Sequence, residues 1–255
     1  MGAGAISQHA GVPIPVIGLV AALPLEVACL AGRLEPGASA TLSGSVRLRL
    51  SGLGSANARR AAIELADSGV TALMSWGSAG GLDPGVRPGT LLLPEYVLTG
   101  DGQRFEVAAA WRAKLHELVS PQLEVHTGAL VESMHPVTTA QQKRALFVRT
   151  GAVAVDTESA AIAEVAASRR LPFVAVRAVL DPATRGLPQS AVAAVDNSGG
   201  FLIKALVRGL LRHPGDLPGL LRLSSDLRLA RGALATVARR TGLQRGLRDV
   251  GFARQ

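Results

Sequence analysis

The residues best placed to do chemistry lie between Val153 and Asp181. An acid-bearing turn at 155–159 precedes an alanine-rich helix and the apolar run 173–179, which leads to Asp181. Ligands of open α/β sheets usually bind at the carboxyl edge of the strands, where the sheet would partly desolvate Asp181. Desolvation raises the pKa of a carboxyl group and lets it carry a proton near neutral pH, as a general acid must. The alternative is an ordinary turn, because Asp before Pro is common turn chemistry.

Two glycine-rich segments, 51–55 and 77–81, follow apolar runs. We expect both as loops at the same sheet edge as Asp181, provided that their strands run parallel to the strand that ends there. Glycine lets a ligand approach the backbone, whose free N–H groups bind anions or hydroxyl groups. Neither segment has the glycine spacing of a mononucleotide-binding or dinucleotide-binding loop, so ordinary tight turns remain an alternative.

Alternating apolar runs and helical patterns must position these residues. Strands are predicted at 16–21, 46–50, 71–76, 90–98, 128–133 and 173–179, and helices at 25–34, 56–67, 111–119 and 139–150. This order predicts an α/β protein of three layers, α/β/α, with a central mixed, largely parallel sheet.

Charge divides the chain into a neutral body and a basic tail. Residues 201–255 contain eleven Lys and Arg against three Asp, an excess equal to the formal charge of +8 of the whole chain. We therefore predict a catalytic domain at 1–213 and a basic helical C-terminal extension at 214–255.

The tail mixes Leu with Arg at helical spacing over 202–211 and 217–237. This pattern favours peripheral contact with an anionic membrane, and a solvated helix that covers an apolar patch is the alternative. Nucleic-acid binding is not expected, because Phe201 and Phe252 are the only aromatic residues of the tail.

Cysteine and histidine usage bears on compartment and metal content. Cys29 is the single cysteine, which excludes an internal disulfide and fits a reducing, cytoplasmic compartment. The five histidines lack the spacing that places two ligands on one helix face, so we expect no metal site. The apolar segment 10–25 has no Lys or Arg before it and contains three prolines, so we expect neither a signal peptide nor a membrane span.

Four blocks, at residues 18–27, 75–81, 154–163 and 176–181, carry a family resemblance. In sequence and order they resemble the superfamily of nucleoside phosphorylases and methylthioadenosine/adenosylhomocysteine nucleosidases. Within it, the chain looks most like the hopanoid-associated phosphorylases, which are thought to remove adenine from adenosylhopane. The resemblance implies cleavage of the N-glycosidic bond of an adenine nucleoside, small or lipid-linked, without a cofactor. It also implies a homodimer or larger homo-oligomer.

The resemblance assigns a role to each of three acids. Asp181 matches the general acid that protonates purine N7, and Glu158 matches the carboxylate that accepts hydrogen bonds from the ribose hydroxyls. Glu26 matches the residue that holds and deprotonates the attacking water in the nucleosidases. The alternatives are that Glu158 is an acid complementing a helix dipole and that Glu26 lies on a solvated helix face.

Three further residues are expected near the acids. Thr157 stands where many relatives have a Met that packs against the ribose, and Val137 lies in the segment expected to contact the purine. Arg177, inside the strand that leads to Asp181, is expected as a buried partner that orients a carboxylate.

The nucleophile is water or phosphate. Phosphorylases of the family usually carry two Arg side chains for phosphate, but here Glu26 and Trp76 stand at those places, and a carboxylate repels phosphate. Ser78 and the backbone amides up to Gly80 still offer a site for phosphate as a co-substrate, with Arg47 as a candidate helper. We predict hydrolysis, with phosphorolysis as the alternative. A non-catalytic nucleoside-binding or membrane-adaptor protein is the alternative of another class.

Overall fold

The computed structural model describes residues 15–32, 34–35, 37–42, 45–194 and 202–243. Its strands are β1 (Ile17–Ala21), β2 (Ser39–Leu42), β3 (Val46–Leu50), β4 (Ala72–Gly81), β5 (Leu91–Leu92), β6 (Tyr96–Leu98), β7 (Arg104–Glu106), β8 (Val125–His126), β9 (Leu130–Glu132), β10 (Ala154–Asp156) and β11 (Phe173–Asp181). Its helices are α1 (Pro24–Ala31), α2 (Ser55–Asp67), α3 (Ala109–Val119), α4 (Ala140–Thr150), α5 (Ser159–Ser168), α6 (Gln189–Val192), α7 (Ile203–Arg212) and α8 (Leu217–Thr241), with a 3₁₀ turn at Pro214–Asp216.

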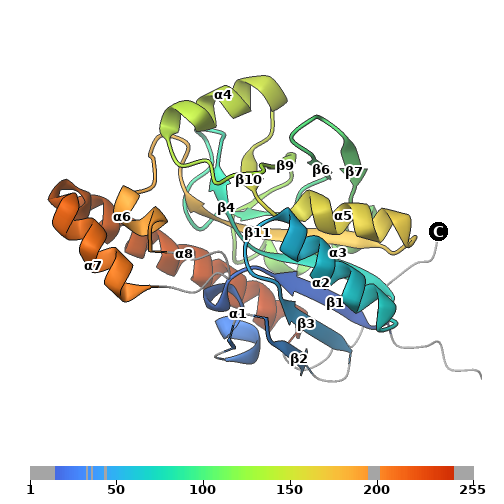
Figure 1. Ribbon diagram of the computed structural model, residues 1–255. Coiled ribbons are helices and arrows are strands. Elements are labelled where there is room, and N and C mark those ends of the chain that lie inside the picture. Colours follow the sequence, from blue (N-terminus) through green and yellow to red (C-terminus); the bar gives the residue numbers. More distant parts are fainter. Residues whose placement is uncertain (1–14, 33, 36, 43–44, 195–201, 244–255) are drawn as a thin grey trace, which may run out of the picture.

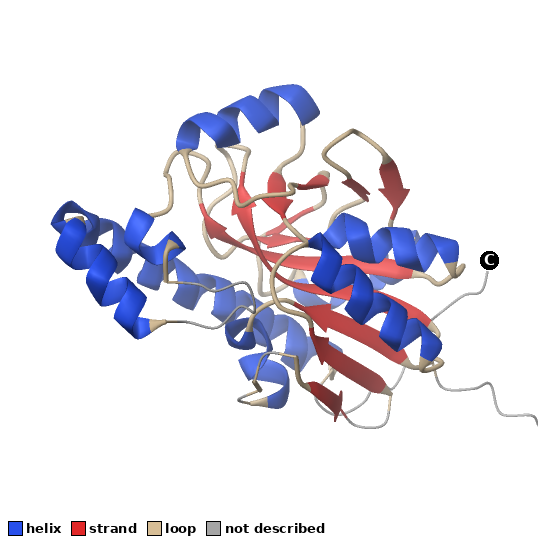
Figure 2. Ribbon diagram, in the orientation of Figure 1, coloured by secondary structure: helices blue, strands red, loops and turns tan. Residues whose placement is uncertain are grey.

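The described strands form one mixed sheet between two layers of helices (Figures 1 and 2). Helices α2 and α5 pack together on one face, and α8 lies on the other, where it contacts β11, α1 and α3. Strands β1, β3, β4 and β11 run parallel to one another. The predicted three-layer α/β/α fold is confirmed, and so is the prediction that the two glycine-rich segments share a sheet edge with Asp181.

Strand β4 organises that edge. It pairs with β11 along one side, and with β1 and then β10 along the other. The pairing with β1 ends at Trp76 and the pairing with β10 begins at Gly80. Residues 77–79 therefore have no strand partner on that side. We call this the β4 opening; its backbone N–H groups are available to side chains or ligands.

Segment 77–81 was expected as a loop, and this prediction is wrong, because β4 continues through Gly81. The glycines serve close approach rather than turning. A Cβ at Gly77 would lie 2.7 Å from Glu26 Oε1 and would overlap the Arg177 guanidinium, so only glycine fits there. A glycine-rich run thus remains a strand because neighbouring side chains fill the space that its own side chains would take.

The two tail helices differ in how they pack. The C-terminal half of α8 belongs to the main core, with Ala230, Leu234 and Val237 almost fully buried. Helix α7 instead exposes Val207 and Leu211. Helices were predicted at both places, and the division into a catalytic domain and an extension at residue 213 stays a prediction.

Some sequence-based expectations concern residues that the structure does not describe. Residues 10–14 of the apolar N-terminal segment, together with Phe201 and Phe252, lie outside the described part of the chain. Within the described residues, every helix is too short or too polar to cross a membrane.

Candidate active site

Glu26 is buried in the first turn of α1, with 6% of the residue exposed. Oε2 accepts hydrogen bonds from the backbone N–H groups of Leu23 (3.0 Å) and Ala22 (3.3 Å). Oε1 accepts from the N–H (2.8 Å) and the hydroxyl (2.7 Å) of Ser78, in the β4 opening. The alternative of a solvated helix face is therefore wrong. The helix N-terminus and the opening together fix this carboxylate as an acceptor between two segments of the chain.

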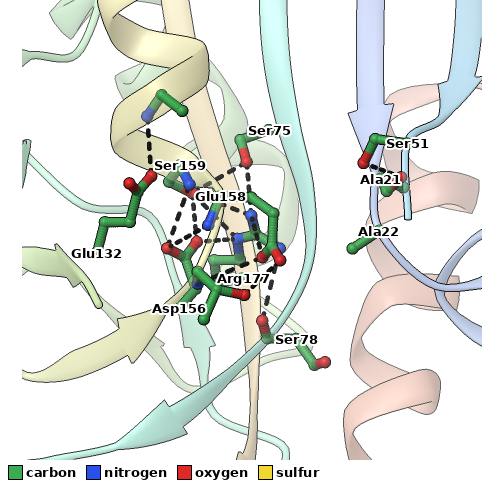
Figure 3. Close-up of polar contacts among 12 residues, drawn as sticks. Ala21, Ala22, Ser51, Ser75, Ser78, Glu132, Asp156, Glu158, Ser159 and Arg177 are labelled. Carbon is green, nitrogen blue, oxygen red and sulfur yellow. Dashed lines mark hydrogen bonds and ion pairs between the residues drawn. The ribbon is translucent and has the colours of Figure 1, made fainter. Parts of the chain in front are cut away.

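Arg177 lies at the centre of a buried polar cluster (Figure 3). Its Nε is 2.8 Å from Asp156 Oδ2, and its Nη2 is 4.0 Å from Glu158 Oε2. Nη2 also donates to the hydroxyls of Ser75 (2.6 Å) and Ser159 (3.0 Å). Burial lowers the pKa of Arg177, but nearby carboxylates (Asp156, Glu158, Glu26 and Glu132) together raise it by more, so that it lies above its ordinary value. Arg177 is thus the charged partner expected from the sequence.

Glu158 precedes α5 and is buried beside Arg177. Oε1 accepts from the N–H of Gly54 (2.9 Å) and from the Thr157 hydroxyl. Burial and repulsion from Asp156 raise the pKa of Glu158, while Arg177 and these hydrogen bonds act against the rise. Its side chain makes no capping bond to α5, which argues against a purely helical role. The first glycine-rich segment thus uses an N–H group to hold a protein carboxylate.

Asp181 ends β11 and is 6% exposed, rather than lying in an open turn. It pairs with Gly80 of β4, where an added Cβ would lie 3.5 Å from Oδ1. Its other oxygen, Oδ2, accepts a hydrogen bond from the ammonium group of Lys143. Burial raises the pKa of Asp181, and the charge of Lys143 opposes that rise.

Residues 77–80 of β4, which are the β4 opening and the glycine after it, lie next to the three acids or their partners. Ser78 binds Glu26, and Gly80 abuts Asp181. The two positions are two residues apart, or about 7 Å along a strand. Arg177, which pairs with Gly77 in the strand register, connects Glu158 to the same segment of β4. Three segments that are distant in the sequence therefore converge on four residues of one strand.

Lys143 and Glu132 are site residues that sequence reasoning missed. Lys143 occupies the buried face of α4, three residues before Leu146, and a Lys at an apolar helical position was the available signal. Glu132 ends β9 and accepts from the N–H of Ala161 at 2.8 Å. Burial, with Asp156 adding repulsion, raises the pKa of Glu132 to about 7.

Other predicted residues lie at or near this edge, with one exception. Thr157 directs its hydroxyl to Glu158, and Val137 packs against a small apolar cluster just before α4. Arg47 instead donates to Ser68 Oγ (2.9 Å), at the start of β3 and the opposite end of the sheet. The expectation that Arg47 helps to bind phosphate is therefore wrong, because Arg47 lies at the amino-terminal end of its strand and the acids lie at the carboxyl-terminal edge of the sheet.

A sequence profile of the Phosphorylase superfamily matches residues 17–212. The chain belongs to this superfamily. A 5'-methylthioadenosine/S-adenosylhomocysteine nucleosidase from Marinomonas sp. is 28% identical over 231 residues, covering 76% of this chain and 99% of that protein. The family resemblance read from the four sequence blocks is confirmed, as is the prediction of an enzyme of this superfamily.

Solved structures of a nucleosidase and of a futalosine hydrolase share the fold. The Streptococcus pneumoniae 5'-methylthioadenosine/S-adenosylhomocysteine nucleosidase with a transition-state inhibitor has a TM-score of 0.63 at 21% identity, covering 88% of this chain and 98% of that one. The futalosine hydrolase of Helicobacter pylori has a TM-score of 0.62 at 15% identity, covering 89% and 98%. Within the described part of this superfamily member, no three His, Cys, Asp or Glu residues are grouped so that they could hold a metal ion.

Proposed function

We propose that this member of the Phosphorylase superfamily hydrolyses the N-glycosidic bond of an adenine nucleoside. One observation carries the choice of water over phosphate: the Glu26 carboxylate already binds both the amide and the hydroxyl of Ser78. A phosphate dianion in the β4 opening would lose those donors and would meet a fixed negative charge. Water is neutral and meets no such repulsion.

The three acids suit the three needs of the reaction, which passes through an oxocarbenium-like ribosyl cation. Glu26 takes a proton from water as the water oxygen bonds to C1′ and the bond from C1′ to N9 breaks. Asp181 gives its proton to purine N7, so adenine leaves as a neutral base. Glu158 accepts hydrogen bonds from the ribose hydroxyls, and its charge stabilises the cation. Solvent then returns the proton from Glu26 to Asp181.

Four other residues support these groups in the proposed reaction. Ser78 holds Glu26, and Thr157 holds Glu158. Gly80 leaves room for the purine beside Asp181, because any side chain there would contact the carboxylate. Val137 contacts the purine from the segment before α4.

Adenine release without phosphate tests the proposed nucleophile. The enzyme is assayed in phosphate-free buffer with a phosphate-scavenging system, and the sugar product is identified by mass spectrometry. We expect the same rate with and without added phosphate, and a free sugar as product. A background rate that rises only when phosphate is added, with a sugar 1-phosphate as product, would establish phosphorolysis instead.

We further propose that the substrate is lipid-linked, as adenosylhopane is. The relative from Marinomonas supports an adenine nucleoside, because its name gives two such substrates. The exposed apolar side chains of α7 support a lipid environment. Rates with adenosine, methylthioadenosine, adenosylhomocysteine and adenosylhopane test this choice. A preference for any of the first three over adenosylhopane would contradict it.

A lipid-linked substrate calls for contact with the cytoplasmic surface of an anionic membrane, which we propose for the basic tail. Leu211 on α7 is 80% exposed and Leu221 on α8 is also exposed, and Arg212 and Arg222 adjoin them in sequence. Exposed apolar side chains beside basic groups are typical of interfacial helices.

Vesicle sedimentation tests this contact. We expect the double variant Leu211→Asp/Leu221→Asp to lose binding to phosphatidylglycerol vesicles. Val148→Asp, at a 78% exposed apolar position on α4, serves as the matched control and is expected to bind like the wild type. Equal binding by the double variant and the wild type would rule out this surface.

We also propose a homodimer, on the family resemblance. The body of the chain is neutral, so charge repulsion does not oppose self-association there. Sedimentation equilibrium at several protein concentrations measures the mass, and a monomer at all of them would contradict the proposal.

A further inference from the structure

Lys143 is a buried charged residue without a role in the proposed reaction. Its exposed fraction is 0%, and it lies in the first turns of α4. Its Nζ donates to the Asp181 carboxylate and to the backbone carbonyls of Pro182 (2.8 Å) and Arg185 (3.0 Å). Three acceptors match the three protons of an ammonium group. Burying a charged lysine without such partners would cost a large amount of free energy. The carbonyl groups of the turn after β11 supply two of these partners.

The two carboxylate oxygens of Asp181 therefore differ in their hydrogen-bond partners. Oδ2 is held by Lys143, whereas Oδ1 accepts no hydrogen bond from the described residues. A Cβ added at Gly80 would lie 3.5 Å from Oδ1 and 3.9 Å from Oδ2. Among the charged groups around Asp181, Lys143 comes from α4, Arg185 from the turn after β11, and Asp226 from α8. Arg185 and Asp226 neutralise each other in an ion pair of 2.6 Å. The charge of Lys143 therefore acts directly on Asp181.

Lys143 also connects Asp181 to the segment proposed to contact the purine. That segment leads into α4, and Thr138 accepts a hydrogen bond from the N–H of Leu187 at 2.8 Å. Gly186 packs so closely on the Thr138 carbonyl that a Cβ there would lie 2.7 Å from it. The turn after β11 and the start of α4 thus form one unit with Lys143 inside it.

We propose that Lys143 is a positioning residue for Asp181: it holds Oδ2 and so leaves Oδ1, which has no donor among the described residues, to give its proton to the purine. The inference rests on the proposed function, which makes Asp181 the general acid. A second consequence follows from charge. An adjacent cation favours the ionised carboxylate, so Lys143 lowers the pH above which Asp181 has lost the proton that it must donate.

The variant Lys143→Met tests both parts, because it keeps the length of the side chain and removes its charge. We expect kcat for adenine release to fall about 10-fold to 100-fold, as misplaced catalytic groups do. We also expect the alkaline limb of the pH profile of kcat to move to higher pH, since the opposing charge is gone. Lys114→Met, at a surface ion pair on α3, is the matched control and should change neither quantity.

The variant Lys143→Arg separates position from charge. Arginine keeps the positive charge but cannot place three donors from one nitrogen, so kcat should fall while the alkaline limb stays in place. An unchanged kcat in this variant would contradict the positioning role. This measurement decides the question even if Lys143→Met does not fold. If Lys143 had only a structural role, Lys143→Met would lower the melting temperature, and the alkaline limb of its kcat profile would stay where it is in the wild type.

The variant Asp181→Asn distinguishes failure of this inference from failure of the proposed function. If Asp181→Asn releases adenine at the wild-type rate, the general-acid assignment fails, whatever Lys143 does. If Asp181→Asn is inactive but Lys143→Met keeps the wild-type kcat and pH profile, the inference about Lys143 alone is overturned.

Discussion

Segment 77–80 of β4 lies between two carboxylates that are held by different chemistry. At one end, Glu26 binds uncharged donors, three backbone N–H groups and one hydroxyl. At the other, Asp181 binds the ammonium group of Lys143 and keeps one oxygen without such a partner among the described residues. Two buried acids become unlike because their partners differ. Burial raises the pKa of Asp181, as a proton donor needs, and the charge of Lys143 limits that rise.

The strongest test of the contrast is Asp181→Asn. Asparagine keeps the shape but has no acidic proton, so kcat should fall by about 10²-fold to 10⁴-fold, the usual contribution of a general acid. Nucleoside binding, measured by calorimetry, should persist. Asp67→Asn, at a surface ion pair, is the control. A nucleoside sensor would show no turnover in either variant or in the wild type.

The next test is Glu26→Gln at the other end. Glutamine cannot accept the proton of water, and its NH₂ group would face backbone or hydroxyl donors, so kcat should fall by about 10²-fold. Steady-state kinetics with phosphate absent measures the effect, and Glu64→Gln on the surface of α2 is the control. Full activity in Glu26→Gln would show that Glu26 is not the group that takes the proton from water.

A smaller effect is expected where α8 touches the Asp181 end. The variant Arg185→Gln breaks the ion pair with Asp226, in which the Arg185 side chain is 35% exposed. We expect a loss of about 1 kcal/mol or less in the free energy of unfolding and a decrease in kcat of a few-fold. Urea unfolding and kinetics check both, against Arg87→Gln at an exposed ion pair. A loss as large as that of Asp181→Asn would show that α8 controls the acid directly.

The smallest predicted effect concerns Glu132, whose pKa of about 7 lies above the ordinary value of 4.5. Its folded environment favours the protonated form, so its contribution to stability is fully present below pH 4.5 and is lost as pH rises from there through 7. Glu132→Gln should match the wild type at about pH 4 and melt about 2–4 °C higher at pH 8. Melting curves of both proteins, with Glu117→Gln as the exposed control, measure this. A constant difference across that range would contradict the raised pKa.

The sequence located some candidate site residues correctly within the fold, for identifiable reasons. Asp181 was found because an apolar run fixes where a strand ends, and Arg177 because a charge inside such a run requires a buried partner. Segment 77–81 was misassigned because its glycines suggest a turn, while their real constraint comes from Glu26 and Arg177 in other parts of the chain. Lys143 was missed because its partner lies 38 residues away in the sequence.

The sequence by itself determined the layered α/β fold, the family blocks and the identity of the acids, since hydrophobic periodicity and local motifs are properties of neighbouring residues. Only the tertiary structure decided which donor holds each acid. Ser78 contacts Glu26, 52 residues away in the sequence, because β4 has no strand partner on one side at that place. Lys143 contacts Asp181 because α4 buries this polar side chain. Pairings of that kind depend on how strands and helices meet in space, which no local spacing records.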